Sequence, residues 1–302
     1  MNFHKELEQR TISLEEMIRA YLPKEEGYQK TVLEAMNYSL RAGGKRLRPM
    51  MMLEIIHAYS GDEALGQPFM AAIEMIHTYS LVHDDLPEMD NDELRRGLPT
   101  THVKYGQAMA VLAGDALLNY SVEILLNAVL EETNPAIQKR MCYAMQVLYR
   151  KAGIYGMIGG QTKDVEAEKK GETSDLEQIL FIDRCKTAAL IQASLMIGAI
   201  LAGASEEDIA SLEKIGYNLG VAFQIQDDIL DITSTTEELG KPVGSDEKNH
   251  KMTYVSYRGL AGAKEDQKQM SEEAVRLLDT LSVTGSLEFL AELMKHLMER
   301  KM

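Results

Sequence analysis

The sequence contains no tryptophan, and its 302 residues include only two cysteines, five phenylalanines and seven prolines. Cys142 and Cys185 form neither a C-x-x-C pair nor the spacing of a zinc site, which excludes a disulfide-rich fold and a cysteine-bound metal centre. Such cysteines are typical of a reducing compartment. Because the amino terminus is charged from Lys5 onwards and lacks an apolar region, we expect no secretory signal and a cytoplasmic location.

Long apolar runs are also missing. The most apolar stretch, residues 188–204, includes Gln192 and Ser194 and falls short of the ~20 apolar residues that a membrane-spanning helix needs. We therefore expect a buried core helix there and no membrane span.

Positive charge is scarce, since 32 Lys and Arg face 47 Asp and Glu for a net charge of −15. Proteins that bind the phosphate backbone of nucleic acids rely on clustered Lys and Arg. We expect no nucleic-acid partner, and any anionic ligand would need a local group of basic residues.

Helix-breaking residues are rare over much of the chain. No proline lies between Pro135 and Pro242, and nowhere do apolar and polar residues alternate with the period of two of a half-buried strand. Apolar residues instead recur every three or four positions, as on the inward face of a helix; examples are Leu212, Ile215, Leu219, Phe223 and Leu230. We predict one all-α domain that spans residues 1–302.

Local patterns predict where some helices begin and where loops lie. Ser13-x-x-Glu16 and Ser174-x-x-Glu177 match the capping box, so each predicts a helix start. The polar segments 163–174 and 232–252 are predicted to be surface loops.

Two groups of aspartates carry the strongest chemical signal. The first acidic motif follows an apolar run and the second lies within the helical stripe; their members are Asp84, Asp85 and Asp90, and Asp227, Asp228 and Asp231. In the second motif the spacing gathers carboxylates on one helical face, where they repel one another unless cations neutralise them. Such hard oxygen ligands suit Mg²⁺ that is held partly by substrate phosphates. Pro87 interrupts the first motif, and a bulge over residues 86–89 would bring Asp84 and Asp90 together.

Acidic runs are more often solvated surfaces, and for either motif alone that is the plainer interpretation. Two motifs 143 residues apart, each preceded by apolar residues, favour a site instead. Isolated Ca²⁺ loops are a further alternative, but the EF-hand pattern with its glycine is absent from both segments.

Basic residues occur where such a site would need partners for an anion. The segment Gly43-Gly44-Lys45-Arg46-Leu47-Arg48 places three cations beside two glycines, where backbone can approach a phosphate and Arg can bind it bidentately. Arg95-Arg96 follows the first acidic motif, while Lys186 and Lys241 are single lysines that by default would be surface residues. Acidic and basic groups together predict a diphosphate substrate.

These segments resemble trans-prenyl diphosphate synthases in order and spacing. Three further segments share the resemblance: Gly159-Gly160-Gln161, Lys186-Thr187 and Phe223-Gln224-x-x-Asp227-Asp228-x-x-Asp231. The likeness spans about residues 30–260. It implies an isoprenoid-synthase-type bundle of long helices around a deep central cavity, usually in a homodimer. Tyr79, five positions before the first aspartate, and the length of the acidic loop are similar to those of the bacterial enzymes that make farnesyl diphosphate.

The resemblance also implies a role for each site residue. The six aspartates would bind three Mg²⁺ ions that hold an allylic diphosphate, and Arg95, Lys186 and Lys241 would contact the same group, supported by Gln161, Thr187 and Gln224. All of these aspartates except Asp231, together with the three cations, would be catalytic. Lys45, Arg48, His77 and Arg96 would bind isopentenyl diphosphate; taken alone, His77 would more simply be a packed core histidine.

The implied reaction is the head-to-tail (1′-4) condensation of isopentenyl diphosphate with dimethylallyl or geranyl diphosphate, mainly to farnesyl diphosphate. Positive groups would stabilise the charge that develops on the leaving oxygen as the allylic carbocation forms. Closure of the loop near residues 240–252 would keep water from the cation. Tyr79 and Ser80, about one helical turn before Asp84, would limit product length, although Tyr79 could also be an ordinary core residue.

Other functions remain as alternatives at this stage. Within the family these are geranylgeranyl diphosphate synthesis and a catalytically silent partner subunit, whose acidic motifs are typically incomplete. Terpene cyclases share the fold but need no binding site for a second diphosphate. A di-iron helical bundle has support from Glu54-x-x-His57 and Glu74-x-x-His77, although it leaves both aspartate motifs unexplained.

Overall fold

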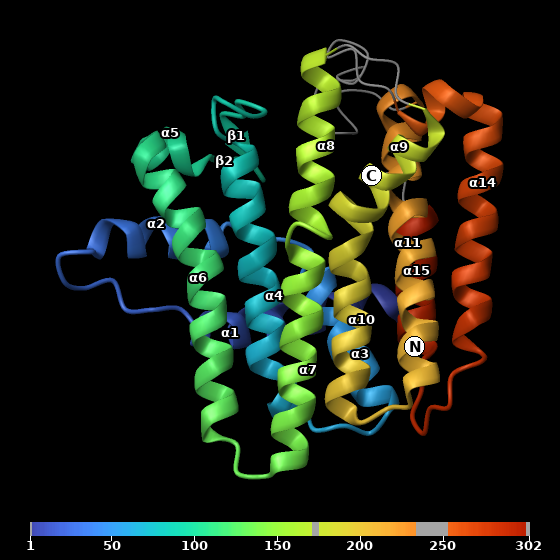
Figure 1. Ribbon diagram of the computed structural model, residues 1–302, viewed down its shortest axis with the longest axis horizontal. Helices are drawn as coiled ribbons and strands as arrows, with labels where there is room; N and C mark the ends of the chain where they lie inside the picture. The colour runs from blue at the N-terminus through green and yellow to red at the C-terminus, as the bar shows by residue number, and fades with distance from the viewer. Residues whose placement is uncertain (1, 171–174, 234–252, 300–302) are drawn as a thin grey trace.

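The computed structural model describes residues 2–170, 175–233 and 253–299, and these confirm the all-α prediction. The first half of the described chain contains α1 (Phe3–Ala20), α2 (Lys30–Arg41), α3 (Leu47–Ala58), α4 (Glu63–Asp84), α5 (Thr101–Tyr105), α6 (Gln107–Glu131) and α7 (Pro135–Ala152). The second half contains α8 (Met157–Lys170), α9 (Leu176–Ile182), the π-helix η1 (Asp183–Ala188), α10 (Ala189–Ala202), α11 (Glu206–Thr233), α14 (Tyr254–Leu278) and α15 (Glu288–Glu299). Most of the long helices run side by side, whereas α2 lies across them (Figure 1).

The only strands among the described residues form a two-residue ladder, in which β1 (Leu94–Arg95) pairs antiparallel with β2 (Leu98–Pro99). This hairpin lies just beyond the carboxyl end of α4 (Figure 1). The carboxyl ends of α4 and α11 lie at the same end of the bundle, so the two acidic motifs are carried to one end of the molecule.

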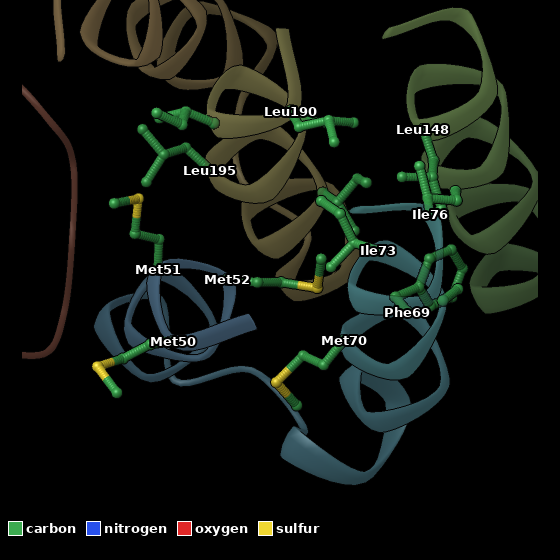
Figure 2. Close-up of a cluster of buried hydrophobic side chains, with 14 of the residues drawn as sticks. Met50, Met51, Met52, Phe69, Met70, Ile73, Ile76, Leu148, Leu190 and Leu195 are labelled. Carbon is green, nitrogen blue, oxygen red and sulfur yellow. The ribbon is translucent and has the colours of Figure 1, made fainter. Parts of the chain in front are cut away.

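The core is centred on α3, α4, α7 and α10. Met50, Met51 and Met52 of α3 are fully buried, and Figure 2 shows side chains of α4, α7 and α10 gathered with them. Burying a side chain of this size contributes ~1.5–3 kcal/mol, and the unbranched thioether of methionine fills irregular gaps between helices. Every residue of α10 from Ala189 to Leu201 is buried, as predicted for a core helix.

Two helical stretches are long and apolar enough to cross a membrane by length and composition alone. In the stretch that ends at Ala202, 83% of its apolar 18-residue segment is buried inside the bundle, so its composition is that of a core helix. In α6 only 39% of the corresponding 18-residue segment is buried, and apolar side chains line the outer surface of this helix.

Glycines allow three helices to approach η1 and α10 closely. A Cβ on Gly160 of α8 would lie 2.3 Å from the backbone nitrogen of Lys186, and one on Gly220 of α11 would lie 2.3 Å from the Cβ of Ala188. On Gly198 of α10 a Cβ would lie 2.6 Å from the carbonyl oxygen of Met52. Only glycine fits at such contacts, because real Cβ atoms do not come this close to other heavy atoms.

Several local predictions are wrong. Helix α1 begins at Phe3, where the side chain of Asn2 accepts from the Lys5 amide at 3.3 Å, so Ser13 lies inside the helix rather than at its start. Residues 163–170 continue α8 and residues 232–233 end α11, so these parts of the predicted loops are helical. The remainder, 171–174 and 234–252, lies outside the described residues, as does Ser174; the cap of α9 is Asp175, which accepts from the Gln178 amide at 2.8 Å.

Candidate active site

The first acidic motif is formed where α4 stops. Asp84 is the last residue of α4, and the chain then turns back so that the Asp90 amide donates to the Asp84 carbonyl at 2.9 Å. The carbonyl of Leu86 accepts from the amides of Met89, at 2.9 Å, and Asn91, at 3.1 Å. The proline-containing segment thus bulges as predicted and returns Asp90 to the helix end.

The carboxylates of this motif are held by side chains from other elements. Gln161 of α8 donates through Nε2 to Asp84 Oδ1 at 2.9 Å, and Arg95 of β1 donates through Nε to Asp85 Oδ1 at 2.7 Å. Burial and, to a smaller extent, the charge of Asp90 raise the pKa of Asp84 to about 6, against the opposing positive charge of Lys186. Burial also raises the pKa of Asp85, although Arg95 opposes it.

The second acidic motif lies in the last two turns of α11. Asp228 and Asp231 are buried and Asp227 is half-buried. Gln224, one turn earlier, donates through Nε2 to Asp228 Oδ1 at 3.1 Å, and the backbone amide of Tyr254 donates to Asp228 Oδ2 at 3.0 Å. These two hydrogen bonds from neutral donors hold the Asp228 carboxylate in place.

The π-helix η1 connects the two motifs. Its Lys186 interacts electrostatically with Asp84 and forms an ion pair with Asp164 of α8, at 2.5 Å between Nζ and Oδ2. The adjacent Thr187 donates to Gln224 Oε1 at 2.9 Å, which leaves the amide nitrogen of Gln224 to bind Asp228. Neighbouring residues of one π-helix therefore reach toward both motifs, and π-helical turns are frequent at functional sites.

A group of arginines surrounds His77. The pKa of His77 is well below its usual value because the ring is buried and because the charges of Arg48, Arg96, Arg46 and Arg95 disfavour its protonation. Carboxylates oppose this charge: Glu74, bound by Arg46 at 2.7 Å within a buried ion pair, Glu15, 3.6 Å from Arg46, and Asp85, bound by Arg95. Burial lowers the pKa of Arg48, and the charge of Arg96 lowers it further. This excess of positive charge fits an anion.

The glycine pair beside the arginines has a steric role. The guanidinium of Arg96 donates to the carbonyl of Gly43, and a Cβ on Gly44, whose φ is +149°, would lie 2.9 Å from that guanidinium. Lys45 is exposed next to them. The glycines thus let the loop before α3 contact the hairpin that follows the first motif, which brings the two predicted basic segments together.

The residues predicted to limit product length lie on α4. Tyr79 is buried, and its ring meets that of His83 edge-on with 5.9 Å between centroids. Ser80 is half-buried and donates to the carbonyl of His77 at 2.9 Å. Between α2, α4 and the hairpin, beside Asp85, there is a cavity of about 30 Å³. The deep channel expected below Asp84 stays a prediction.

Two predictions concern residues that the structure does not describe. Lys241 and the loop over residues 240–252 lie outside the described ranges, so their roles stay predictions.

Three functional contacts were missed from the sequence. Asp164 lies three residues after Gln161, hence on the same face of α8, but the polar segment 163–174 was interpreted as a loop. Arg46 was part of the basic segment without a role of its own, and it proves to be buried, with a left-handed φ of 47°. Nothing in the sequence around Tyr254 indicates a contact with Asp228.

The Glu-x-x-His motifs do not form a common site. Glu54 is bound by Arg10 and Glu74 by Arg46, so each glutamate faces an arginine. His57 contacts Glu63 at the surface, at 3.0 Å. These pairs offer no support for the di-iron alternative.

The donor set of the acidic motifs fits Mg²⁺. Within the described ranges, no three Asp, Glu, His or Cys side chains are arranged to hold a metal ion by themselves. Mg²⁺ usually binds through one or two carboxylates, waters and substrate phosphates, so sparse protein ligation is what this ion requires. Asp84, with its raised pKa beside Asp85 and Asp90, is a carboxylate whose ionised form a divalent cation would stabilise.

Comparisons with known proteins agree with one another. Residues 29–290 match the model of the polyprenyl synthetase family. The chain is 45% identical over 282 residues to a farnesyl diphosphate synthase of Geobacillus stearothermophilus, a match that covers 93% of each chain.

Two solved structures are similar over almost the whole fold. One is a geranylgeranyl pyrophosphate synthetase from Pyrococcus horikoshii, with a TM-score of 0.87, 32% identity and coverage of 99% of this chain and 98% of that one. The other is a geranyltransferase from Helicobacter pylori complexed with magnesium and isoprenyl diphosphate, with a TM-score of 0.81, 34% identity and coverage of 98% and 96%.

Proposed function

The chain belongs to the polyprenyl synthetase family, and from this premise we propose that it is a farnesyl diphosphate synthase that joins isopentenyl diphosphate to an allylic diphosphate. One observation on this chain's own residues carries the assignment: neighbouring residues of η1 interact with both acidic motifs. Lys186 acts on Asp84 while Thr187 binds the partner of Asp228, which supports one shared site rather than two separate surfaces.

The allylic diphosphate would bind between the acidic motifs. Bound Mg²⁺, three ions by family resemblance, would neutralise the diphosphate and make it a better leaving group. The six aspartates Asp84, Asp85, Asp90, Asp227, Asp228 and Asp231 would hold these ions. Arg95 would add positive charge after leaving its present partner Asp85, and Lys186 would do so while Asp164 still holds it, since an ammonium has three donors. We propose the same contact with the diphosphate for Lys241.

Isopentenyl diphosphate would bind at the arginine group around His77. Arg48 and Arg96 bring charge beyond that of Arg46 and Arg95, which bind Glu74 and Asp85, and Lys45 lies beside them. A diphosphate would complete this arrangement with bidentate contacts to guanidinium groups. A terpene cyclase, which takes one diphosphate, has no use for this second group of cations.

The reaction requires no nucleophile from the protein. When the allylic C–O bond breaks, its electron pair leaves with the diphosphate and a carbocation remains. The double bond of isopentenyl diphosphate attacks that cation, and the adduct loses a proton to form the new double bond; the departing diphosphate is a plausible acceptor. The protein holds both diphosphates by charge, orients the two reacting carbons and excludes water.

We propose that Tyr79 closes the space below Asp84 and so ends the product at farnesyl diphosphate. The geranylgeranyl alternative would require the growing chain to pass this side chain. Both names occur among the similar proteins, so the products themselves decide.

We further propose a cytoplasmic homodimer. Along α6, Val111, Leu112, Leu126 and Leu130 are exposed although they are apolar. A second copy of the chain that packs on this face would bury them, and gel filtration with light scattering would measure the mass.

The proposed function is tested with the purified chain alone. With Mg²⁺, isopentenyl diphosphate and either dimethylallyl or geranyl diphosphate, we expect farnesyl diphosphate as the main product by chromatography, and none after chelation with EDTA. A dominant C20 product would assign geranylgeranyl synthesis instead. No product from the well-folded chain would indicate a silent subunit and refute the proposal.

A further inference from the structure

The position of Asp228 depends on the start of α14 as well as on its own helix. One carboxylate oxygen accepts from the Gln224 side chain at 3.1 Å, and the other accepts from the backbone amide of Tyr254 at 3.0 Å. Gln224 belongs to α11, one turn before Asp228, but Tyr254 is the first residue of α14. Whatever fixes the backbone of Tyr254 therefore also orients one side of Asp228.

Tyr254 is fixed by a cluster within α14. Its hydroxyl donates to Asp266 Oδ2 at 3.0 Å, and Arg258 binds the same carboxylate through two nitrogens, at 2.7 and 3.1 Å. Tyr254 and Val255 are buried against Ile225 and other apolar residues of α11. The hydrogen bond from Arg258 lowers the pKa of Asp266, and burial raises that of Tyr254 to about 12, so near neutral pH the carboxylate accepts and the hydroxyl donates.

These contacts require a break in the helix. Tyr254 and Asp266 are 12 residues apart, which on a continuous α-helix separates them by ~18 Å along the axis, too far for the two side chains to meet. The break is at Gly259, whose φ of 70° and ψ of 157° are not helical. A Cβ there would meet nothing within 4 Å, so glycine is needed for its backbone conformation and not for space.

We propose that Tyr254, Arg258 and Asp266, folded back on one another at Gly259, are positioning residues that orient Asp228 for binding of the allylic diphosphate. The inference rests on the proposed function and deepens it, because it has these residues act through the Tyr254 amide rather than by contact with a substrate. Their effect is specific to one substrate, since the arginine group around His77 takes no part in these contacts.

The test compares Tyr254→Phe, Asp266→Asn and Arg258→Lys with the wild-type enzyme. Tyr254→Phe keeps the buried ring and removes the bond to Asp266, and Asp266→Asn weakens the grip of Arg258. We expect each of these two variants to raise the KM for geranyl diphosphate and the Mg²⁺ concentration for half-maximal rate about three- to tenfold, and to leave the KM for isopentenyl diphosphate within twofold. Arg258→Lys, which keeps the charge but loses the two-nitrogen contact, should give a smaller rise of the same kind.

A pair of glycine variants tests the break in the helix at Gly259. Gly259→Ala forces alanine into a left-handed conformation and should reproduce the allylic defect. Gly262→Ala, three residues later in the same helix, adds a Cβ whose contacts are all with Arg258 and are ordinary ones, from 3.6 Å, so it should leave Arg258 in place and behave as wild type or be slightly more stable.

A second readout does not depend on turnover. In hydrogen–deuterium exchange, the peptide that contains Tyr254 should be protected in the wild-type protein and exchange at least several-fold faster in Asp228→Ala and Asp266→Asn. If wild-type protein makes no prenyl product, the proposed function fails while exchange still decides whether the contact exists. Unchanged exchange in both variants overturns the inference, as does an equal rise of both KM values, or no rise at all, in variants with an unchanged unfolding midpoint.

Discussion

Replacing Tyr79 by alanine is the most informative perturbation of product length. Tyr79 lies five residues before Asp84 on the same helix, so its Cα is ~7.5 Å further from the acidic motif along the axis. The side chain is buried, and the described residues provide no hydrogen-bond partner for its hydroxyl. Burial and the charge of Asp84 together raise the pKa of this hydroxyl to about 12, so it stays neutral.

Two opposing contributions determine the stability of Tyr79→Ala. Truncating a buried aromatic side chain costs about 3–5 kcal/mol, whereas removing a buried unpartnered hydroxyl restores about 1–3 kcal/mol. We expect a net loss of about 2 kcal/mol in the free energy of unfolding, measured by urea denaturation. Tyr79→Phe removes only the hydroxyl and should be stabilising or neutral.

Product analysis separates the roles of space and of the hydroxyl. Tyr79→Ala should shift the main product from C15 to C20 or longer, while Tyr79→Phe should still stop at C15. As a matched control, Tyr149→Ala removes a tyrosine of α7 whose hydroxyl forms a hydrogen bond with Ser121 of α6, at 3.1 Å, and should lower stability without changing the product. A folded, active Tyr79→Ala enzyme that makes only C15 would refute the role of Tyr79.

Three further predictions follow from the site. Asp164→Asn removes the carboxylate bound to Lys186 and should lower kcat/KM for the allylic substrate about tenfold, about 1.4 kcal/mol, in steady-state assays; an unchanged value would contradict the role of this pair. Gly160→Ala places a Cβ 2.3 Å from the backbone nitrogen of Lys186, so it should lower the free energy of unfolding in urea denaturation by about 1–3 kcal/mol and also lower the activity, whereas Gly262→Ala should change neither. Because the pKa of His77 is lower in the folded than in the unfolded protein, the unfolded chain binds more protons below pH ~6.5, and stability falls there as the pH falls. His77→Asn should reduce this loss, as should inorganic diphosphate, in unfolding midpoints measured against pH.

The fold class and the two acidic motifs could be predicted because both depend on local sequence. Apolar residues at helical spacing determine which face of α11 is buried, and Asp227, Asp228 and Asp231 occupy defined positions on that helix. The turn after Asp84 was predictable from Pro87, since proline cannot continue a helix there. Individual helix ends were less predictable, because the match at Ser13 resembles a cap but lies within α1.

What the sequence did not show are contacts between residues far apart in the chain. Asp164 and Lys186 are 22 residues apart and Asp228 and Tyr254 are 26 apart, so neither pairing follows from local spacing. The polar composition of 163–174 was misleading because the outer face of α8 is solvated while its inner face carries Gln161 and Asp164 into the site.

The geometry of the site also depends on residues that carry no charge. Lys186 and Thr187 are adjacent on η1, and adjacent side chains on a helix point roughly a quarter turn apart, so one can face α4 while the other faces α11. This works only if η1 lies close to the helices on both sides. Gly160 of α8 and Gly220 of α11 permit that approach, because a Cβ at either position would lie 2.3 Å from η1 atoms. The spacing between the two acidic motifs is therefore set by these two glycines as much as by the aspartates themselves.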